Sequence, residues 1–190
     1  MLAEGKAAGG SGVSLTPDDV VLNSLPGHHA FGFMSVHFEA AIQGATTVYW
    51  SDTRPFMMAR SRFLAAVEAE GITVLPGVPF VFDALAGLDD AVDMRRLRSA
   101  YTGGVSLKRP IYDRFFQRFG IRLGQGYGST EFGQAAFNDG ADPEAWDSVG
   151  HVLPGTEIEI VECEIVVRSP HLTKGYLGVD AASNAAFTPR

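Results

Sequence analysis

Two kinds of apolar segment alternate along most of the chain. Short runs rich in β-branched residues lie at 20–25, 45–50, 72–75, 97–102 and 121–123, and they predict strands. Longer segments at 31–43, 55–70, 79–86 and 106–119 have the length and pattern of helices, and each is followed directly by a glycine, as helices commonly are. Strands that alternate with helices through short connections predict a mostly parallel sheet flanked by helices, which is the α/β class.

The pattern changes after residue 150. Residues 156–161 and 164–168 alternate between apolar and polar side chains, which is typical of half-exposed antiparallel strands, and a hairpin around Glu162-Cys163 would join them. We therefore expect a flexible segment rich in Gly, Ala and Ser at 1–14, an α/β subdomain at 15–148 and a small antiparallel β-rich segment at 149–190.

Composition narrows the class of protein further. A chain of 190 residues with 46% hydrophobic and 19% charged residues fits a globular protein with one substantial core and does not fit a disordered one. The net charge of -7 argues against non-specific binding to nucleic acid or to an anionic membrane. The single cysteine, Cys163, excludes an internal disulfide, and no apolar run approaches the roughly 18 residues of a membrane span. Because the first residues also lack a signal-peptide core, we expect a cytoplasmic protein.

One short segment concentrates groups that bind phosphate. Gln125-Gly126-Tyr127-Gly128-Ser129-Thr130-Glu131 follows the apolar run at 121–123. Glycine lets a ligand approach the backbone, small hydroxyls and amides suit phosphate, and a carboxylate suits the Mg²⁺ that accompanies phosphate. A loop of this kind just past a strand is where an open α/β sheet binds its ligand. Taken alone, however, a tight turn with a solvated Glu131 is the simpler interpretation.

A second glycine-rich segment changes that balance. Thr102-Gly103-Gly104-Val105-Ser106 also follows a predicted strand and opens a predicted helix, so its amides would be free at a helix N-terminus. The two strands concerned are consecutive in a βαβ unit, and we expect them to be neighbours. Two glycine-rich loops at the carboxyl ends of neighbouring strands predict a crevice that binds an anion or a polar ring.

The adjacent histidines His28 and His29 are a third candidate. They project in different directions, so they cannot form the i, i+4 pair of a helical zinc site, and the other histidines show no ligand spacing with Cys163. One of the two either caps the helix expected from Phe31 or contacts phosphate or substrate, and the residues alone leave both interpretations open. Ser106 and Ser129 lack the sequence context of a nucleophilic serine.

Taken in their order along the chain, the three segments resemble the AMP-forming adenylate ligase superfamily. This superfamily includes acyl- and aryl-CoA synthetases, the adenylation domains of peptide synthetases, and firefly luciferase. The resemblance extends from about Leu15 to Arg190. Residues 25–33 are similar to the family's Pro-x-x-His-x-x-Gly segment, which selects His29 and not His28. Residues 102–107 resemble its Ser-Gly-Gly-Ala-Pro-Leu loop, and residues 126–131 match its Tyr-Gly-x-Thr-Glu motif. Residues 148–155, 164–170 and 175–177 resemble the β-rich part that follows.

The resemblance implies a reaction and a set of partners. A carboxylic acid attacks the α-phosphate of ATP in the presence of Mg²⁺, which gives an acyl-adenylate and pyrophosphate, and a thiol of CoA or of a carrier protein then takes the acyl group. By the same resemblance, the adenine and acyl groups are bordered by Gly103, Gly104, Val105, Gly126, Tyr127, Gly128 and Ser129. Thr130 would contact phosphate, Glu131 would hold magnesium, and His29 would lie near the acyl carboxylate. Positioned donors and a metal suit a reaction that builds charge on phosphate.

Several family features are missing from the chain. A phosphate loop with its lysine is expected before residue 15, and a Thr-Gly-Asp ribose motif and a C-terminal domain with a catalytic lysine are expected after residue 190. We therefore interpret the chain as the middle of the large N-terminal domain of such a ligase. We expect it to be inactive alone and to self-associate through surfaces that truncation exposes. The alternative is a naturally truncated binding or interaction module that keeps the fold without the chemistry.

Overall fold

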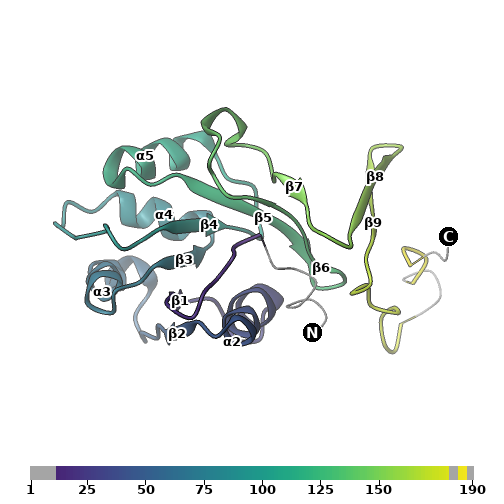
Figure 1. Ribbon diagram of the computed structural model, residues 1–190, viewed down its shortest axis with the longest axis horizontal. Coiled ribbons are helices and arrows are strands. Elements are labelled where there is room, and N and C mark those ends of the chain that lie inside the picture. The colour runs from purple at the N-terminus through teal and green to yellow at the C-terminus, as the bar shows by residue number, and fades with distance from the viewer. Residues whose placement is uncertain (1–11, 180–183, 188–190) are drawn as a thin grey trace.

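A computed structural model describes residues 12–179 and 184–187. Within these residues the chain forms a seven-stranded sheet flanked by helices and a separate two-stranded sheet (Figure 1). The large sheet has the order β2-β1-β3-β4-β5-β6-β7; its pairs from β2 to β5 are parallel, and β6 and β7 are antiparallel additions. The α/β class predicted from the alternating pattern is confirmed.

The strands β1 to β5 and the helices between them lie close to the positions expected from the pattern, whereas β6, β7 and the turn η2 were not expected. The strands of the large sheet are β1 (Val20–Asn23), β2 (Thr46–Tyr49), β3 (Val74–Gly77), β4 (Ser99–Thr102), β5 (Leu123–Ser129), β6 (Gly133–Asn138) and β7 (His151–Val152). The helices are the π-helix η1 (Phe31–Phe38), which continues into α2 (Glu39–Gln43), then α3 (Phe56–Ala69), α4 (Pro79–Ala86), α5 (Arg109–Phe119) and the single 3-10 turn η2 (Pro143–Ala145). The small sheet pairs β8 (Glu157–Val161) with β9 (Glu164–Arg168).

Alternate residues of the parallel strands face two separate cores. Leu22, Leu75 and Leu123 belong to a core that packs against α3, α4 and α5. Val21 and Val74 belong to a smaller core with residues of η1 and α2. Because both faces of β1 and β3 are covered, their sequences are largely apolar and lack the period-two alternation of a half-exposed strand.

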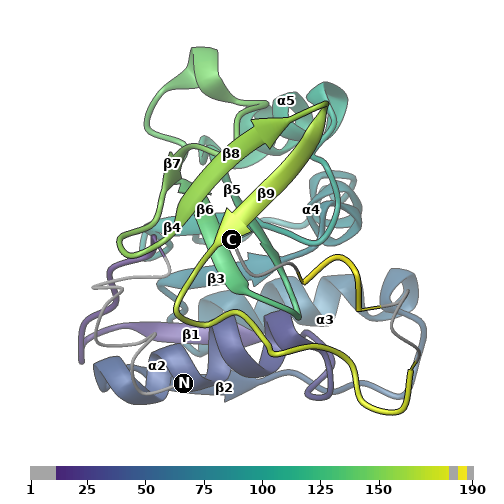
Figure 2. The ribbon, with the colours of Figure 1, turned by 90° about the vertical axis from the view of Figure 1, so that its right-hand side faces the viewer.

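The β8–β9 hairpin lies beside the large sheet, to its right in Figure 1 and in front of it in Figure 2. Glu162 and Cys163 form its turn with φ of 49° and 68°, as in a two-residue turn of the primed kind. The hairpin predicted around these two residues is therefore present. β7 pairs with β6, so residues 151 and 152 complete the large sheet.

The ends of the chain are described only in part. Residues 1–11 of the segment expected to be flexible lie outside the described residues, whereas Val13 is buried in the smaller core with Tyr101 and Phe137. The domain boundaries at residues 15 and 149 remain predictions. Across the part of the chain that the structure describes, no helix is both long and apolar enough to cross a membrane.

Candidate functional site

A cavity of about 640 Å³ lies where the chain leaves β1 and β4 and along the far end of β5. Nine of the ten site residues expected from the sequence line it, namely His29, Gly103, Gly104, Gly126, Tyr127, Gly128, Ser129, Thr130 and Glu131. The tenth, Val105, lines an adjoining cavity instead. Segments about 100 residues apart in the sequence therefore meet at one site, as the expected crevice requires.

The segment 126–131 is a strand end and a turn, which corrects the expected loop past a strand. β5 continues through Ser129 and pairs with β6 as an antiparallel hairpin, with a register shift between Tyr127 and Gly128. β4 pairs with β5 only as far as Thr102 and Gln125. Beyond that point residues 126–129 pair with β6 alone, which leaves their other edge facing the cavity.

The glycines of this strand make room for β6 as well as for a ligand. A Cβ added to Gly128 would come within 2.9 Å of the Gln134 Cα and closer still to the Gly133 carbonyl oxygen. At Gly126 the obstacle would be the Gln134 amide nitrogen at 2.9 Å. At Gly128 the close approach of the β6 backbone favours a residue without a side chain, whereas at Gly126 the obstacle is the side chain of Gln134.

The segment 103–106 does not open a helix, which corrects a second expectation. α5 begins at Arg109, with Lys108 as its N-cap and Pro110 in its first turn, where proline is favoured. Residues 103–108 form a loop whose Leu107 N–H donates to the Gln125 side-chain oxygen over 3.2 Å. The amides of Gly103 and Gly104 therefore do not lie at a helix N-terminus, and the expectation that this segment opens a helix is wrong.

His29 lies just before η1, hydrogen-bonds to its first residue and lines the cavity, whereas its contact with phosphate or substrate remains a prediction. Its Nδ1 accepts the Phe31 N–H over 3.1 Å, which places the proton of the neutral ring on Nε2. Its ring lines both cavities, whereas His28 lines neither of them. η1 supplies Phe31, Met34 and Ser35 to the wall beside it, and π-helical segments are often found at functional sites.

Glu131 is held by a segment far along the chain. The Tyr176 hydroxyl donates to Glu131 Oε1 over 2.7 Å, and the Thr173 N–H donates to the Glu131 carbonyl over 2.7 Å. Hydrogen bonds from the Ser129 and Tyr176 hydroxyls hold the pKa of Glu131 below its usual value. The carboxylate is therefore ionised and oriented at neutral pH. Pro170 and His171, from the same segment, line the cavity.

Several lining residues carried no signal at the sequence level. Ala30, Met34, Ser35, Gly133, Gln134, Pro170 and His171 line the cavity but were not expected there. Most of them flank the motifs by a few residues. Tyr176 belongs to a segment that resembles the family, but neither its type nor its spacing indicates a contact with Glu131, because 45 residues separate the two.

The single carboxylate of the cavity suits a metal ion that binds together with a phosphate-containing ligand. Glu131 is the only carboxylate among the lining residues, and no group of three or more His, Cys, Asp or Glu able to hold a metal occurs among the described residues. Mg²⁺ commonly takes one or two carboxylates and completes its shell with phosphate and water. One carboxylate fits that mode and does not fit a metal site built from protein alone.

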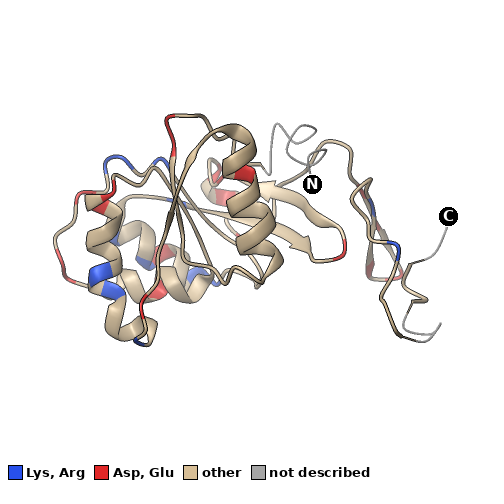
Figure 3. Cartoon of the chain, turned by 90° about the horizontal axis from the view of Figure 1, so that it is seen from below, with Lys and Arg blue, Asp and Glu red and all other residues tan. Residues whose placement is uncertain are grey.

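Positive charge is absent from this wall of the cavity. The residues that line it in the described part of the chain include no lysine or arginine. Figure 3 shows the basic residues mainly on the helices and loops at the other end of the large sheet, away from the β5–β6 hairpin. Within the described residues, the polar groups that line this wall are backbone amides, hydroxyls, amide side chains and histidines, besides Glu131.

A second cavity of about 720 Å³ adjoins the first and shares His29, Phe31 and Gly104 with it. Its walls are largely apolar, with Trp50, Phe56 and Phe80 among them. Asp52, Arg54 and Arg62 form an ion-paired group beside it: the Arg54 Nε and the Arg62 Nη1 each donate to the Asp52 carboxylate over 3.0 Å. Hydrogen bonds from Arg54 hold the pKa of Asp52 below its usual value, so it stays ionised.

Comparisons with known proteins agree with this geometry. Residues 3–177 match the model of a family described as AMP-binding enzyme. The chain is 34% identical over 183 residues to 4-coumarate–CoA ligase-like 9 of Arabidopsis thaliana, which covers 87% of this chain and 32% of that protein. It is 30% identical over 170 residues to the mitochondrial malonate–CoA ligase ACSF3 of Mus musculus, and the match covers 83% of this chain and 29% of that protein. The chain thus spans about a third of the length of these relatives.

Solved structures share the fold. A malonyl-CoA ligase in a ternary product complex with methylmalonyl-CoA and AMP superposes with a TM-score of 0.75 at 26% identity, over 98% of this chain and 42% of that one. A benzoate CoA ligase from Burkholderia xenovorans LB400 superposes with a TM-score of 0.79 at 22% identity, over 98% of this chain and 40% of that one. The latter likeness shows the fold alone.

Proposed function

Because the chain belongs to the AMP-binding enzyme family, we propose that it forms the nucleotide- and acid-binding wall of a ligase that activates a carboxylic acid with ATP. The product of that step is an acyl-adenylate. The observation that carries the proposal is the single cavity lined by His29, Gly103, Gly104 and the strand end 126–131. Three separate segments of the family motif set contribute to it, which a set of unrelated turns would not do.

The roles within the cavity follow from the groups available. The exposed edge of residues 126–129 and the glycines at 103 and 104 let a flat ring lie close to the backbone. The His29 Nε2–H donates to a carboxylate oxygen of the acid and orients it. The other carboxylate oxygen attacks the α-phosphorus, the bond from phosphorus to the bridging oxygen breaks, and pyrophosphate leaves with the electron pair.

In this proposal, Thr130 contacts a phosphate group and Glu131 binds the metal that accompanies the phosphates. The Thr130 hydroxyl donates to a phosphate oxygen, and the Glu131 carboxylate, oriented by Tyr176 and Ser129, is the protein ligand for Mg²⁺. When bound, Mg²⁺ neutralises charge on the phosphate oxygens. Because the lining residues offer no cation of their own, the proposal expects this step to depend strongly on the metal.

The second cavity is the proposed route for the thiol that accepts the acyl group. It meets the first cavity at His29, so a thiol that enters it reaches the acyl carbon without crossing the nucleotide. One of the two relatives reported above is named a CoA ligase and the other a CoA ligase-like protein, which favours CoA as the acceptor. A carrier-protein thiol has the same chemistry and is the other acceptor expected.

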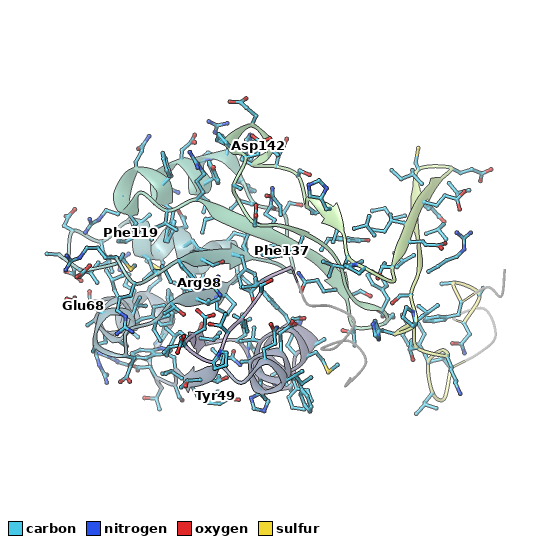
Figure 4. All side chains as sticks on the ribbon, in the orientation of Figure 1. Tyr49, Glu68, Arg98, Phe119, Phe137 and Asp142 are labelled. Carbon is cyan, nitrogen blue, oxygen red and sulfur yellow. The ribbon has the colours of Figure 1, made fainter. Side chains whose placement is uncertain are left out.

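Acid-dependent exchange of labelled pyrophosphate into ATP tests the proposal on the native gene product. We expect Glu131→Ala to lower the exchange rate about 100-fold or more, because it removes charge stabilisation of the transition state. Glu68→Ala is the matched control, since Glu68 is exposed on α3 at the end of the molecule opposite the β8–β9 hairpin (Figure 4). Exchange that is undiminished in Glu131→Ala would contradict the role given to Glu131.

The 190 residues alone are expected to show no turnover. The cavity wall that they form carries no lysine or arginine in its described part, so nothing on it neutralises a triphosphate besides the metal. Robust formation of an acyl-adenylate by the isolated chain would overturn this expectation.

A further inference from the structure

The loop that carries His29 is closed by its own hydrogen bonds. It leaves β1 after Asn23 and enters η1 at Phe31. The His29 N–H donates to the Pro26 carbonyl over 3.0 Å, and the Phe33 N–H donates to the His29 carbonyl over 3.0 Å. A Cβ on Gly32 would lie 2.7 Å from the Pro26 carbonyl oxygen. The loop is therefore a tight unit, and its position depends on how that unit is joined to the sheet.

Asn23 joins this loop to the sheet from both of its ends. The Asn23 Nδ2 donates to the Gly32 carbonyl over 3.0 Å, and its Oδ1 accepts the Leu25 N–H over 3.1 Å. The Asn23 carbonyl also accepts the Trp50 N–H over 3.0 Å, which anchors the residue beside β2. One side chain thus contacts the first part of the loop, the first turn of η1 and, through its backbone, the neighbouring strand.

The burial of Asn23 makes this an unusual position for an amide. Only 2% of the residue is exposed, and the preceding strand residues Val20, Val21 and Leu22 are all apolar. Burial of a polar side chain is unfavourable unless its groups are hydrogen-bonded, and here the donor and the acceptor are both used. An apolar side chain of similar size would remove the hydrogen bonds to the Gly32 carbonyl and from the Leu25 N–H.

We propose that Asn23 is a positioning residue for His29: it fixes the loop so that the His29 ring stands at the boundary shared by the two cavities. That Asn23 fixes the loop rests on the hydrogen bonds alone. That this placement of His29 affects catalysis rests on the proposed function. Asn23 lines neither cavity as such and acts only through the loop.

The state of the His29 ring gives a test that needs no activity. In protein labelled with ¹⁵N-histidine, long-range ¹H–¹⁵N spectra report which ring nitrogen carries the proton. In the unsubstituted protein the neutral ring should be the Nε2–H tautomer, because Nδ1 accepts the Phe31 N–H. Asn23→Thr and Asn23→Ser keep an oxygen that can accept the Leu25 N–H but cannot reach Gly32. In both we expect a second set of His29 signals or a mixture of the two ring forms.

Asn138 provides the matched control. It is 6% exposed, donates through Nδ2 to the Ala145 and Ser148 carbonyls, and accepts the Gly140 N–H, so it is an equally buried amide that ties down a different loop. Asn138→Ser should lower thermal stability in the same way as Asn23→Ser and leave the His29 signals unchanged. An effect on His29 from both sites would indicate general loosening and would overturn the proposal.

Kinetics then separate positioning from binding. In the exchange assay with the native gene product, Asn23→Thr should lower kcat about tenfold, as a small displacement of a reacting group does, while KM for ATP stays within about twofold. Single His29 signals and unchanged kcat in folded Asn23→Thr and Asn23→Ser would overturn the proposal. If no variant and no unsubstituted protein exchanged pyrophosphate, the proposed function would fail, and the ring signals would still decide whether Asn23 positions His29.

Discussion

Individual residues of the cavity serve the protein's own packing as well as any ligand. Gly128 shows this most clearly, because a Cβ at this position would meet the backbone of β6. Gly104 differs from it: it has a φ of 83° and open space where a Cβ would stand. Its conformation, and not contact with a neighbouring strand, therefore favours glycine there.

The crowding at Gly128 predicts a stability effect. Gly128→Ala should lower the free energy of unfolding by about 1–3 kcal/mol, because the obstacle is the backbone of β6, which cannot move aside as a side chain can. Gly27→Ala is the control, since a Cβ at Gly27 would have nothing within 4 Å. Urea unfolding of the two variants measures the difference. Equal stability would show that the β5–β6 hairpin is looser than its geometry indicates.

The sequence singled out nine of the residues that line the cavity but not the physical reason for each residue. Glycine signals a missing side chain, and the same signal arises from a turn, a ligand or a neighbouring strand. His29 was distinguishable from His28 only through the resemblance to a family. Asn23 and Tyr176 were not identifiable, because their partners, Gly32 and Glu131, are recognised only once the chain has folded.

At the scale of elements, an ion pair joins the starting ends of three parallel strands. Asp19 precedes β1, Thr73 precedes β3 and Arg98 precedes β4. The Asp19 carboxylate accepts a hydrogen bond from Thr73 Oγ1 over 2.6 Å and one from Arg98 Nε over 2.8 Å. Arg98 is labelled in Figure 4. Only 4% of Asp19 is exposed. Hydrogen bonds from Arg98 hold the pKa of Asp19 below its usual value, with smaller contributions from Thr73 and Thr16, and they outweigh the burial that raises it.

This pair predicts a pH-dependent contribution to stability. Because the pKa of Asp19 is depressed in the folded state, its contribution is fully present above the unfolded pKa of about 4 and is lost as the pH falls below that value. Asp19→Asn should therefore be less stable by about 2 kcal/mol at pH 7, and the difference should shrink below pH 4. Urea unfolding at pH 7, 5 and 3 measures this.

Asp93→Asn is the control for this series, because the Asp93–Arg95 pair is exposed and such pairs contribute little. A difference between Asp19→Asn and the unsubstituted protein that is the same at pH 3 as at pH 7 would contradict the assignment to the ionised carboxylate.

The order and type of β1 to β5 and of the helices between them followed from the sequence, whereas β6, β7 and the ends of two elements did not. β5 reaches Ser129 because β6 supplies an antiparallel partner, and no local pattern in a glycine-rich segment indicates such a partner. α5 begins at Arg109 because Gln125 holds Leu107 in the preceding loop and Pro110 favours the first turn. In both cases a contact with a distant residue decided the boundary.

At the scale of the whole molecule, the chain supplies one wall of a site and leaves apolar groups exposed. Ile160 on β8 is 74% exposed and Leu177 is 99% exposed. Self-association through such groups remains a prediction, and sedimentation velocity over a range of protein concentrations tests it. The chain spans about a third of the length of its curated relatives. Ligand binding at its own cavity is therefore the property that best tests its contribution to activity.

The central claim is that this cavity binds the nucleotide of an acyl-adenylate. Titration of ¹⁵N-labelled protein with AMP, followed by amide chemical shifts, tests it most directly. We expect saturable shifts concentrated at Gly103, Gly104, Gly126, Gly128 and Thr130, with the amides of α3 unchanged. Saturable shifts confined to other parts of the chain, with these five amides unmoved, would contradict the account.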